Sequence, residues 1–130
     1  MPAFSSLASS YWEAVFGGCV WECVIDADGK PGQWYLHLFA VEQPDLNWEN
    51  PEVVAHLEDV LKFWLDRGVA GFRIDVAHGM FKEAGLPDIR KDPAASMLGT
   101  EHKPFWDQEG VHDVYRAWRK ILDSYPGDRM

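Results

Sequence analysis

The sequence has 130 residues, enough for one domain of ordinary size with a hydrophobic core. Hydrophobic residues make up 47% of the chain and charged residues 25%, a composition that excludes an intrinsically disordered protein. The formal net charge of -9 argues against nucleic acid and against an anionic membrane surface as partners, because either would require a basic face. A neutral ligand is compatible with this charge.

Aromatic residues make up 14% of the chain, and seven of them are tryptophan. They either fill the core or line a site for a flat apolar ligand face, such as the C–H face of a sugar; composition does not distinguish the two. Cys19 and Cys23 lack the second pair that a metal motif or a disulfide framework needs. The D-x-D-G stretch at 26–29 lacks the remaining ligands of a calcium loop. We therefore expect no metal and no other cofactor.

The chain carries no apolar run of membrane-spanning length, and residues 1–10 lack the basic start and the long apolar stretch of a signal peptide. We therefore expect a cytoplasmic protein without membrane contact. Residues 1–10 are small and polar, and they are predicted to be a disordered end. The next stretch, up to about residue 40, is strand-like and aromatic. Its clearest part, "GQWYLHLF", alternates, and the Asp, Gly and Pro residues of "IDADGKPG" predict the turn of a hairpin before it.

"NPEVVAHLEDVLKFWLDRG" predicts the clearest helix. Asn50 is a good N-cap, Pro51 fits the first helical position, and Gly68 ends the helix as a C-terminal cap. A nearly all-apolar segment follows at Val69, so helix, short glycine connection and buried strand together predict one half of a βαβ unit. Residues 81–106 lose periodicity and predict a long loop, and a second helix follows with its apolar face from Val111 to Leu122.

The predicted strand ends with an arginine and an aspartate on one face. Because a strand has a period of two residues, Arg73 and Asp75 share a face, and they lie toward the carboxyl end, where parallel α/β folds place their ligand sites. A neighbouring arginine keeps the aspartate ionised, and an ionised carboxylate in a partly desolvated site is a plausible nucleophile. The alternative is a structural ion pair that closes the end of the strand.

These residues carry a resemblance to a known family. "GFRIDVAH" at 71–78 resembles the fourth-strand motif of the α-amylase superfamily, the family 13 glycoside hydrolases. "QPDLNWENP" at 43–51 resembles the stretch before the third barrel helix in the α-glucosidase and oligo-1,6-glucosidase branch. "YWEAVFGGCVW" and "GQWYLHLF" resemble the small inserted domain of the same branch. The similarity runs from about Tyr11 to the C-terminus, with several motifs in the right order.

The resemblance implies a fold and a division into domains. The fold is α/β: a partial (β/α)₈ TIM barrel around strands 3–4 and helices 3–4, with part of a small inserted β-rich domain. Residues 11–42 would belong to the inserted domain and residues 43–130 to the catalytic barrel. A complete barrel takes about 250 residues, so the chain would be an internal fragment. Its exposed barrel edges would leave it open to self-association.

The resemblance also implies an activity: retaining hydrolysis of α-glucosidic bonds in oligosaccharides or disaccharides through a covalent glycosyl-enzyme. Asp75 would be the nucleophile, Arg73 the neighbour that orients it and keeps it charged, and His78 either a substrate contact or a loop residue. The inserted domain helps to wall the sugar site in this family. Its residues Phe16, Trp34 and His37 would either take part in that or pack in the core.

The general acid is the missing part of this mechanism. A retaining glycosidase needs a second carboxyl group about 5 Å from the nucleophile. In this family it is a glutamate at the end of the fifth barrel strand, and neither Glu101 nor Glu109 matches its motif. We therefore expect the isolated chain to be inactive. Two alternatives remain: a related transglycosidase or sugar isomerase, and a non-catalytic amylase-like subunit that only binds or scaffolds.

Overall fold

The computed structural model describes residues 12–89, 93–99 and 101–130. The chain forms two compact units. The first combines the N-terminal stretch up to Asp45 with Lys82–Phe105, and the second combines Leu46–Phe81 with Trp106–Met130. The division predicted from the sequence, with 1–10 as a disordered end, 11–42 in an inserted domain and 43–130 in the barrel, stays a prediction. In the structure, the later segment 82–105 groups with the N-terminal unit.

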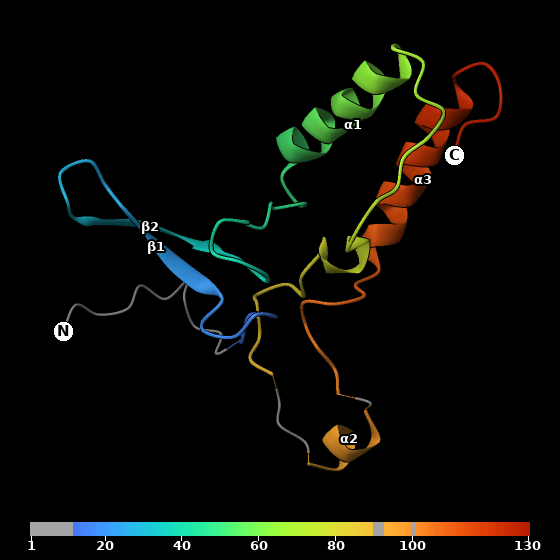
Figure 1. Ribbon diagram of the computed structural model, residues 1–130. Helices are drawn as coiled ribbons and strands as arrows, with labels where there is room; N and C mark the ends of the chain where they lie inside the picture. Colours follow the sequence, from blue (N-terminus) through green and yellow to red (C-terminus); the bar gives the residue numbers. More distant parts are fainter. Residues whose placement is uncertain (1–11, 90–92, 100) are drawn as a thin grey trace. The chain divides into compact units, whose positions relative to one another are not determined.

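The first unit is built on a β-hairpin of β1 (Trp21–Ile25) and β2 (Pro31–Leu36), as the turn signals predict. The two strands are antiparallel (Figure 1). Trp21 pairs with Leu36. In the turn, the Asp26 N–H donates to the Lys30 carbonyl at 2.9 Å, and Gly29 takes a positive φ of 80°, which suits a residue without a side chain. The hydrophobic side chains buried in this unit are Trp12, Ala14, Val20, Leu38 and Phe105.

The segment 82–105 is not the continuous loop that the sequence suggests. It contains a short helix, α2 (Pro93–Leu98), with proline at its first position. The helix gave no periodic apolar signal because its hydrophobic residues do not form a core: the Met97 and Leu98 side chains are exposed. This segment is held to the N-terminal part of its unit by Trp12, whose indole Nε1–H donates to the Pro87 carbonyl at 2.8 Å.

The second unit contains two helices, α1 (Pro51–Leu65) and α3 (Gly110–Asp123), which pack side by side (Figure 1). Both were predicted. The Asn50 side chain caps α1 by accepting the Glu52 N–H at 2.9 Å. At the other end the Gly68 N–H donates to the Leu65 carbonyl, with φ of 89° at Gly68. The core between the helices consists of Leu61, Val114, Trp118 and Leu122.

The segment 69–75 was predicted to be a buried parallel strand, and this prediction is wrong for the chain as it stands. The described residues form strands only in the β1–β2 hairpin. Phe72 packs against the helix core, whereas Arg73, Ile74 and Asp75 are exposed. The physical reason is that a parallel strand takes its hydrogen bonds and its burial from neighbours on both sides. Among the described residues, the ladder-type backbone pairing of this segment is with Met130, at Ala70 and Phe72.

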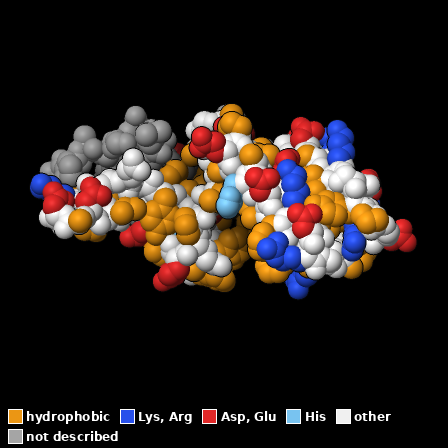
Figure 2. Space-filling view, turned by 90° about the horizontal axis from the view of Figure 1, so that it is seen from above, with side chains coloured by type: hydrophobic (Ala, Val, Ile, Leu, Met, Phe, Trp, Pro, Cys, Tyr) orange, Lys and Arg blue, Asp and Glu red, His pale blue; other side chains and the backbone are white. Residues whose placement is uncertain are grey.

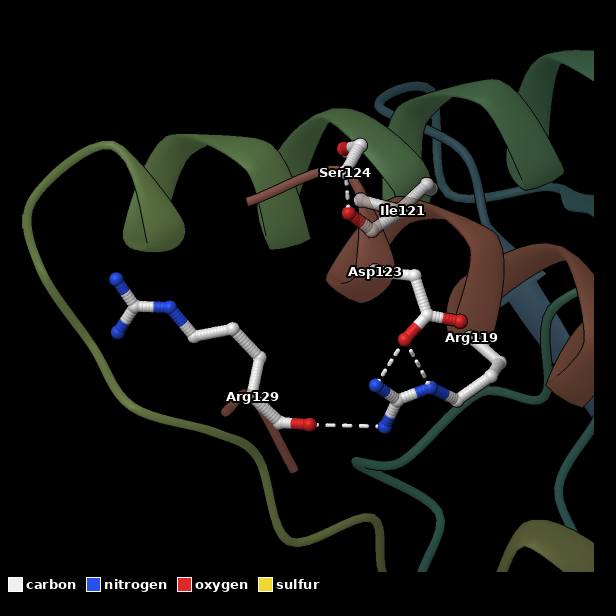
Figure 3. A network of polar contacts seen from close by, with 5 residues as sticks. All are labelled: Arg119, Ile121, Asp123, Ser124 and Arg129. Atoms are coloured by element: carbon white, nitrogen blue, oxygen red, sulfur yellow. Dashed lines mark hydrogen bonds and ion pairs between the residues drawn. The ribbon is translucent and has the colours of Figure 1, made fainter. Parts of the chain in front are cut away.

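Two arginines hold the C-terminal residues beside this segment: Arg119 on α3 and Arg129 after the helix. Arg119 bonds the Asp123 carboxylate and also donates to the Arg129 carbonyl at 2.8 Å (Figure 3). The Arg129 guanidinium in turn donates to the Val69 carbonyl at 3.2 Å. These contacts bring Met130 beside Gly71, where the two backbones meet.

Several large hydrophobic side chains of the second unit reach solvent. Hydrophobic surface is visible between the charged groups in Figure 2. The exposed members on the helices and on the segment 69–75 are Val60, Phe63, Trp64, Ile74 and Tyr115. No described helix is both long and apolar enough to cross a membrane.

Candidate active site

The arginine and the aspartate predicted to act together form an ion pair. Arg73 Nη2 lies 3.5 Å from Asp75 Oδ1. The side chains are 87% and 77% exposed, so the expectation of a desolvated pair is wrong for this chain. An ion pair in water contributes at most about 1 kcal/mol to stability, because solvent screens it and two long side chains must be held in place. The contact therefore brings the two groups together without adding much to the stability of the fold.

Just before the Arg73–Asp75 ion pair, the backbone forms the hydrogen bonds of a parallel strand around one residue, Gly71. The Met130 N–H donates to the Ala70 carbonyl at 3.1 Å, and the Phe72 N–H donates to the Met130 carbonyl at 2.7 Å. In a parallel ladder, one residue forms two backbone hydrogen bonds, one to each neighbour of the residue that it faces. Met130 forms this pattern around Gly71. Gly71, the residue in between, has no room for a Cβ atom against the Met130 carbonyl. The site therefore follows directly on a parallel backbone pairing.

The chain turns sharply after Asp75. Val76 has φ 53° and ψ 28°, in the left-handed region that β-branched residues rarely adopt. A short 3₁₀ helix, η1 (Ala77–Gly79), follows, and the Gly79 N–H donates to the Val76 carbonyl at 2.9 Å. Strained backbone of this kind is found preferentially at functional sites, where the surrounding structure holds it. Asp75 is the last residue before this turn.

His78 lies on η1, three residues after Asp75, and its side chain is exposed. Its ring lies against the Trp106 ring, with the centroids 4.6 Å apart, and its carbonyl accepts the Asp107 N–H at 2.8 Å. The three residues singled out from the sequence thus occupy one short stretch, and two of them are in direct contact. The Trp106 and Asp107 contacts were not foreseen, because nothing local in the sequence links residues 78 and 106.

Glu101 and Glu109 are the two residues weighed as possible general acids. Glu109 occupies the N-cap position of α3 in the second unit, where its side chain makes no capping hydrogen bond. Glu101 belongs to the first unit. Among the described residues no group of three or more His, Cys, Asp or Glu side chains is arranged to hold a metal ion.

The aromatic residues considered for the sugar site belong to the first unit, and their environments differ. Phe16 is 73% exposed and packs edge to face on Phe39, with centroids 6.0 Å apart. Trp34 is also exposed. His37 is buried: its Nδ1 lies 3.2 Å from the Phe39 carbonyl, while its Nε2 has no hydrogen-bond partner. Core packing thus describes His37 but not Phe16 or Trp34.

The first unit also contains a largely buried ion pair, which no local pattern in the sequence indicates. Lys82 Nζ lies 2.5 Å from Asp45 Oδ1, with the side chains only 10% and 16% exposed. The other carboxylate oxygen of Asp45 accepts the Leu38 N–H at 2.7 Å. Burial lowers the pKa of Lys82 below its usual range, against the opposing effect of the Asp45 carboxylate. Both residues lie at positions where the chain passes from one unit to the other, at 45/46 and 81/82.

Comparison with known proteins places the chain in a family. A model of the α-amylase catalytic domain matches residues 4–130. The oligo-1,6-glucosidase of Parageobacillus thermoglucosidasius is 52% identical over 115 residues, which are 88% of this chain and 20% of that protein. The chain thus spans about a fifth of the length of the curated relative that it matches.

Solved structures of related enzymes are also similar to this chain. The α-glucosyl transfer enzyme XgtA superposes with a TM-score of 0.76 at 35% identity, over 92% of this chain and 24% of that one. A variant isomaltulose synthase from Erwinia rhapontici NX5, solved with sucrose, gives 0.72 at 33%, over 96% and 21%. The chain is part of an α-amylase catalytic domain, which is a TIM barrel. The part present here contains few helices and a small antiparallel sheet. It belongs to the α-amylase family of glycoside hydrolases, in the oligo-1,6-glucosidase and α-glucosidase branch.

Proposed function

We propose that this chain is a segment of a retaining α-glucosidase-type enzyme in which Asp75 is the nucleophile. The observation that carries the proposal is the ion pair between Arg73 and Asp75, which stands between a parallel backbone pairing and a left-handed turn. The ends of barrel strands are where enzymes of this fold carry their catalytic groups. Arg73 orients the carboxylate. His78 is proposed as a substrate contact beside it.

The reaction follows from these roles. An Asp75 carboxylate oxygen attacks the anomeric carbon of an α-linked glucose, and the bond to the leaving oxygen breaks. A second carboxylic acid, about 5 Å away, protonates that oxygen, and water later releases the sugar from Asp75. Neither Glu101 nor Glu109 matches the motif of that acid. We therefore propose that the acid lies outside these 130 residues, and that the isolated chain is inactive.

The parts of the chain are proposed to fit the barrel as follows. α1 is the third barrel helix, residues 69–75 are the fourth strand, and α3 is the fourth helix. The parallel pairing of Met130 with Gly71 supports the proposal that Met130 begins the next strand. The β1–β2 hairpin and its surroundings, 11–42, are part of a small inserted domain. In a closed barrel, neighbouring strands would desolvate the Arg73–Asp75 pair, which is exposed here.

The substrate class is an α-linked glucose oligosaccharide or disaccharide. Hydrolysis and sugar transfer share the glycosyl-enzyme and differ in whether water or another sugar accepts the glucose. The likeness to a glucosyl transfer enzyme and to an isomaltulose synthase supports transfer or isomerisation as the second candidate. Product analysis in the presence of excess acceptor sugar separates the two candidates by their main product. A hydrolase releases mostly free glucose, whereas a transferase yields mostly transfer products and an isomerase mostly the isomer of its substrate.

Two experiments test the proposal in sequence. The coding DNA is first read on both sides of this segment, and we expect an open frame that continues into a strand ending in glutamate. The protein encoded by the whole frame is then assayed on an aryl α-glucoside beside its Asp75→Asn variant. Asp75→Asn should lose activity by several orders of magnitude, because an amide cannot form the intermediate. Undiminished activity in the variant would refute the assignment of Asp75.

The exposed hydrophobic side chains support a further proposal, that the isolated chain self-associates. Val60, Phe63 and Trp64 on α1 and Ile74 near the site are open to solvent, and large exposed hydrophobic side chains favour association. Sedimentation velocity over a range of protein concentrations tests this. A monomer at every concentration would contradict it.

A further inference from the structure

The turn after Asp75 is in a conformation that its own sequence does not favour. Val76 has two methyl groups on Cβ, and a positive φ brings them against the backbone. No glycine or asparagine relieves this position, and an exposed turn of this sequence would relax on its own. Something outside the turn must therefore hold it, and the contacts to residues 106–110 show what does.

Trp106 makes the first of these contacts. Its ring lies tilted against the His78 ring, with the centroids 4.6 Å apart, and also covers Gly79, so closely that a Cβ atom at Gly79 would collide with the indole. Gly79 is buried under this ring. The indole thus closes over two of the three residues of η1.

Asp107 makes the second contact, through its backbone. Its N–H donates to the His78 carbonyl at 2.8 Å, which ties the middle of η1 to the segment before α3. Asp107 itself has φ 55°, a conformation that aspartate tolerates better than most residues. Gln108 closes the arrangement by donating from its side-chain amide to the Trp106 carbonyl at 3.0 Å.

A third contact fixes the far end of the turn. The Phe81 ring lies on Gly110 at the start of α3, where a Cβ atom would come within 2.7 Å of a ring carbon. Phe81 also packs against the helix core. The stretch from Val76 to Phe81 is therefore held at its middle by Trp106 and Asp107 and at its end by the first turn of α3.

We infer that Trp106 is a positioning residue for Asp75. Its ring holds η1 against the segment before α3, and this keeps Val76 in the left-handed conformation. The conformation of Val76 in turn sets the direction in which the chain leaves Asp75, and the backbone on that side limits the rotamers that the carboxylate can adopt. The consequence for catalysis rests on the proposed role of Asp75, whereas the effect of Trp106 on the turn does not.

The test measures the turn directly, by NMR on the isotope-labelled 130-residue chain. The variants are Trp106→Ala, which removes the ring, and Trp106→Phe, which keeps a flat ring. Trp64→Ala is the matched control, because it removes an exposed indole from α1 in the same unit. The readouts are the couplings that report φ of Val76 and χ1 of Asp75, and the exchange rates of the Gly79 and Met80 amides.

We expect Trp106→Ala to lose the couplings of a positive φ at Val76 and to average the Asp75 side chain over several rotamers. Exchange at the Gly79 and Met80 amides should rise about tenfold or more while the amides of α1 exchange as before, since strain of this kind relaxes once its support is removed. Trp106→Phe should restore most of the native values, and Trp64→Ala should leave them unchanged.

Two outcomes would overturn the inference. One is a folded Trp106→Ala chain in which Val76 keeps its positive φ and Asp75 its rotamer. The other is exchange that rises equally in α1 and in the turn, because that pattern means a general loss of stability. Neither outcome bears on whether Asp75 is a nucleophile, which the activity assay of the whole frame decides separately.

Discussion

The backbone carbonyl of Met130 occupies the space that a side chain on Gly71 would need. Glycine is required here for close approach between two chain segments, because the parallel pairing puts the two backbones in direct contact. The requirement links the end of the chain to the segment that carries Asp75.

Gly71→Ala should therefore separate Met130 from its pairing. We expect a loss of about 1–3 kcal/mol in the free energy of unfolding, the usual cost of forcing an extra methyl group into a filled space. Urea unfolding followed by circular dichroism measures it. Met130→Ala is the control, since the Met130 side chain is exposed and its backbone carbonyl stays in place. Equal stability of Gly71→Ala and the parent chain would contradict the expectation.

The helix cap gives a second prediction. Asn50→Ala removes the acceptor of the Glu52 N–H and should lower the free energy of unfolding by about 0.5–2 kcal/mol. Asn50→Asp keeps an acceptor and should cost little. Thermal unfolding of the three proteins gives the order of stability, and an alanine variant as stable as the aspartate variant would show that the cap contributes nothing.

The features that could be predicted from the sequence are those whose causes are local. Asn50, Pro51 and Gly68 bound α1 through contacts within a few residues, and the hairpin turn carries its own Asp and Gly signals. The strand predicted at 69–75 is not found, because its causes are not local. Its composition suits a buried strand, but burial and pairing come from neighbours that are distant in sequence.

The candidate site divides in the same way. The pairing of Arg73 with Asp75 follows from a spacing of two residues, and the structure contains it. The contact between the Trp106 and His78 rings joins residues 28 positions apart in the sequence. The ion pair of Lys82 with Asp45 joins residues 37 positions apart. No periodicity reports such contacts. From the sequence, Lys82 would be expected at the surface like most lysines. In the structure its side chain is only 10% exposed.

The Lys82–Asp45 pair provides the third prediction. Asp45→Ala leaves the Lys82 ammonium buried without its partner and also removes the acceptor of the Leu38 N–H, so it should cost about 3–5 kcal/mol. Lys82→Met should cost less, because the charge that burial disfavours is removed as well. Exchange of the Leu38 amide reports on this unit specifically.

The matched control for this pair lies on α1. Lys62 and Asp59 form an exposed ion pair at 3.1 Å, so Lys62→Met should change stability by less than about 1 kcal/mol. A loss in Lys62→Met as large as that in Asp45→Ala would show that the burial of the Lys82–Asp45 pair adds nothing to the first unit.

Alkaline pH should weaken the contact between α1 and the end of α3. The Tyr125 hydroxyl donates to Asp66 Oδ1 at 2.7 Å, and this hydrogen bond, followed by burial and by the Asp66 charge, raises the pKa of Tyr125 above its usual value. A phenol with a raised pKa stabilises the fold below about pH 10, and this contribution is lost as the pH rises through the folded-state pKa, because a phenolate would face the carboxylate.

Tyr125→Phe lacks both the hydrogen bond and the ionisation. It should be less stable than the parent chain at neutral pH, and the difference should shrink as the pH passes about 10. Unfolding in urea at a series of pH values from 7 to 11 measures this, and Tyr115→Phe serves as the control because the exposed Tyr115 packs on the His112 ring through its own ring, which phenylalanine keeps. A constant difference between Tyr125→Phe and the parent over the whole series would mean that ionisation of Tyr125 does not act on the Asp66 contact.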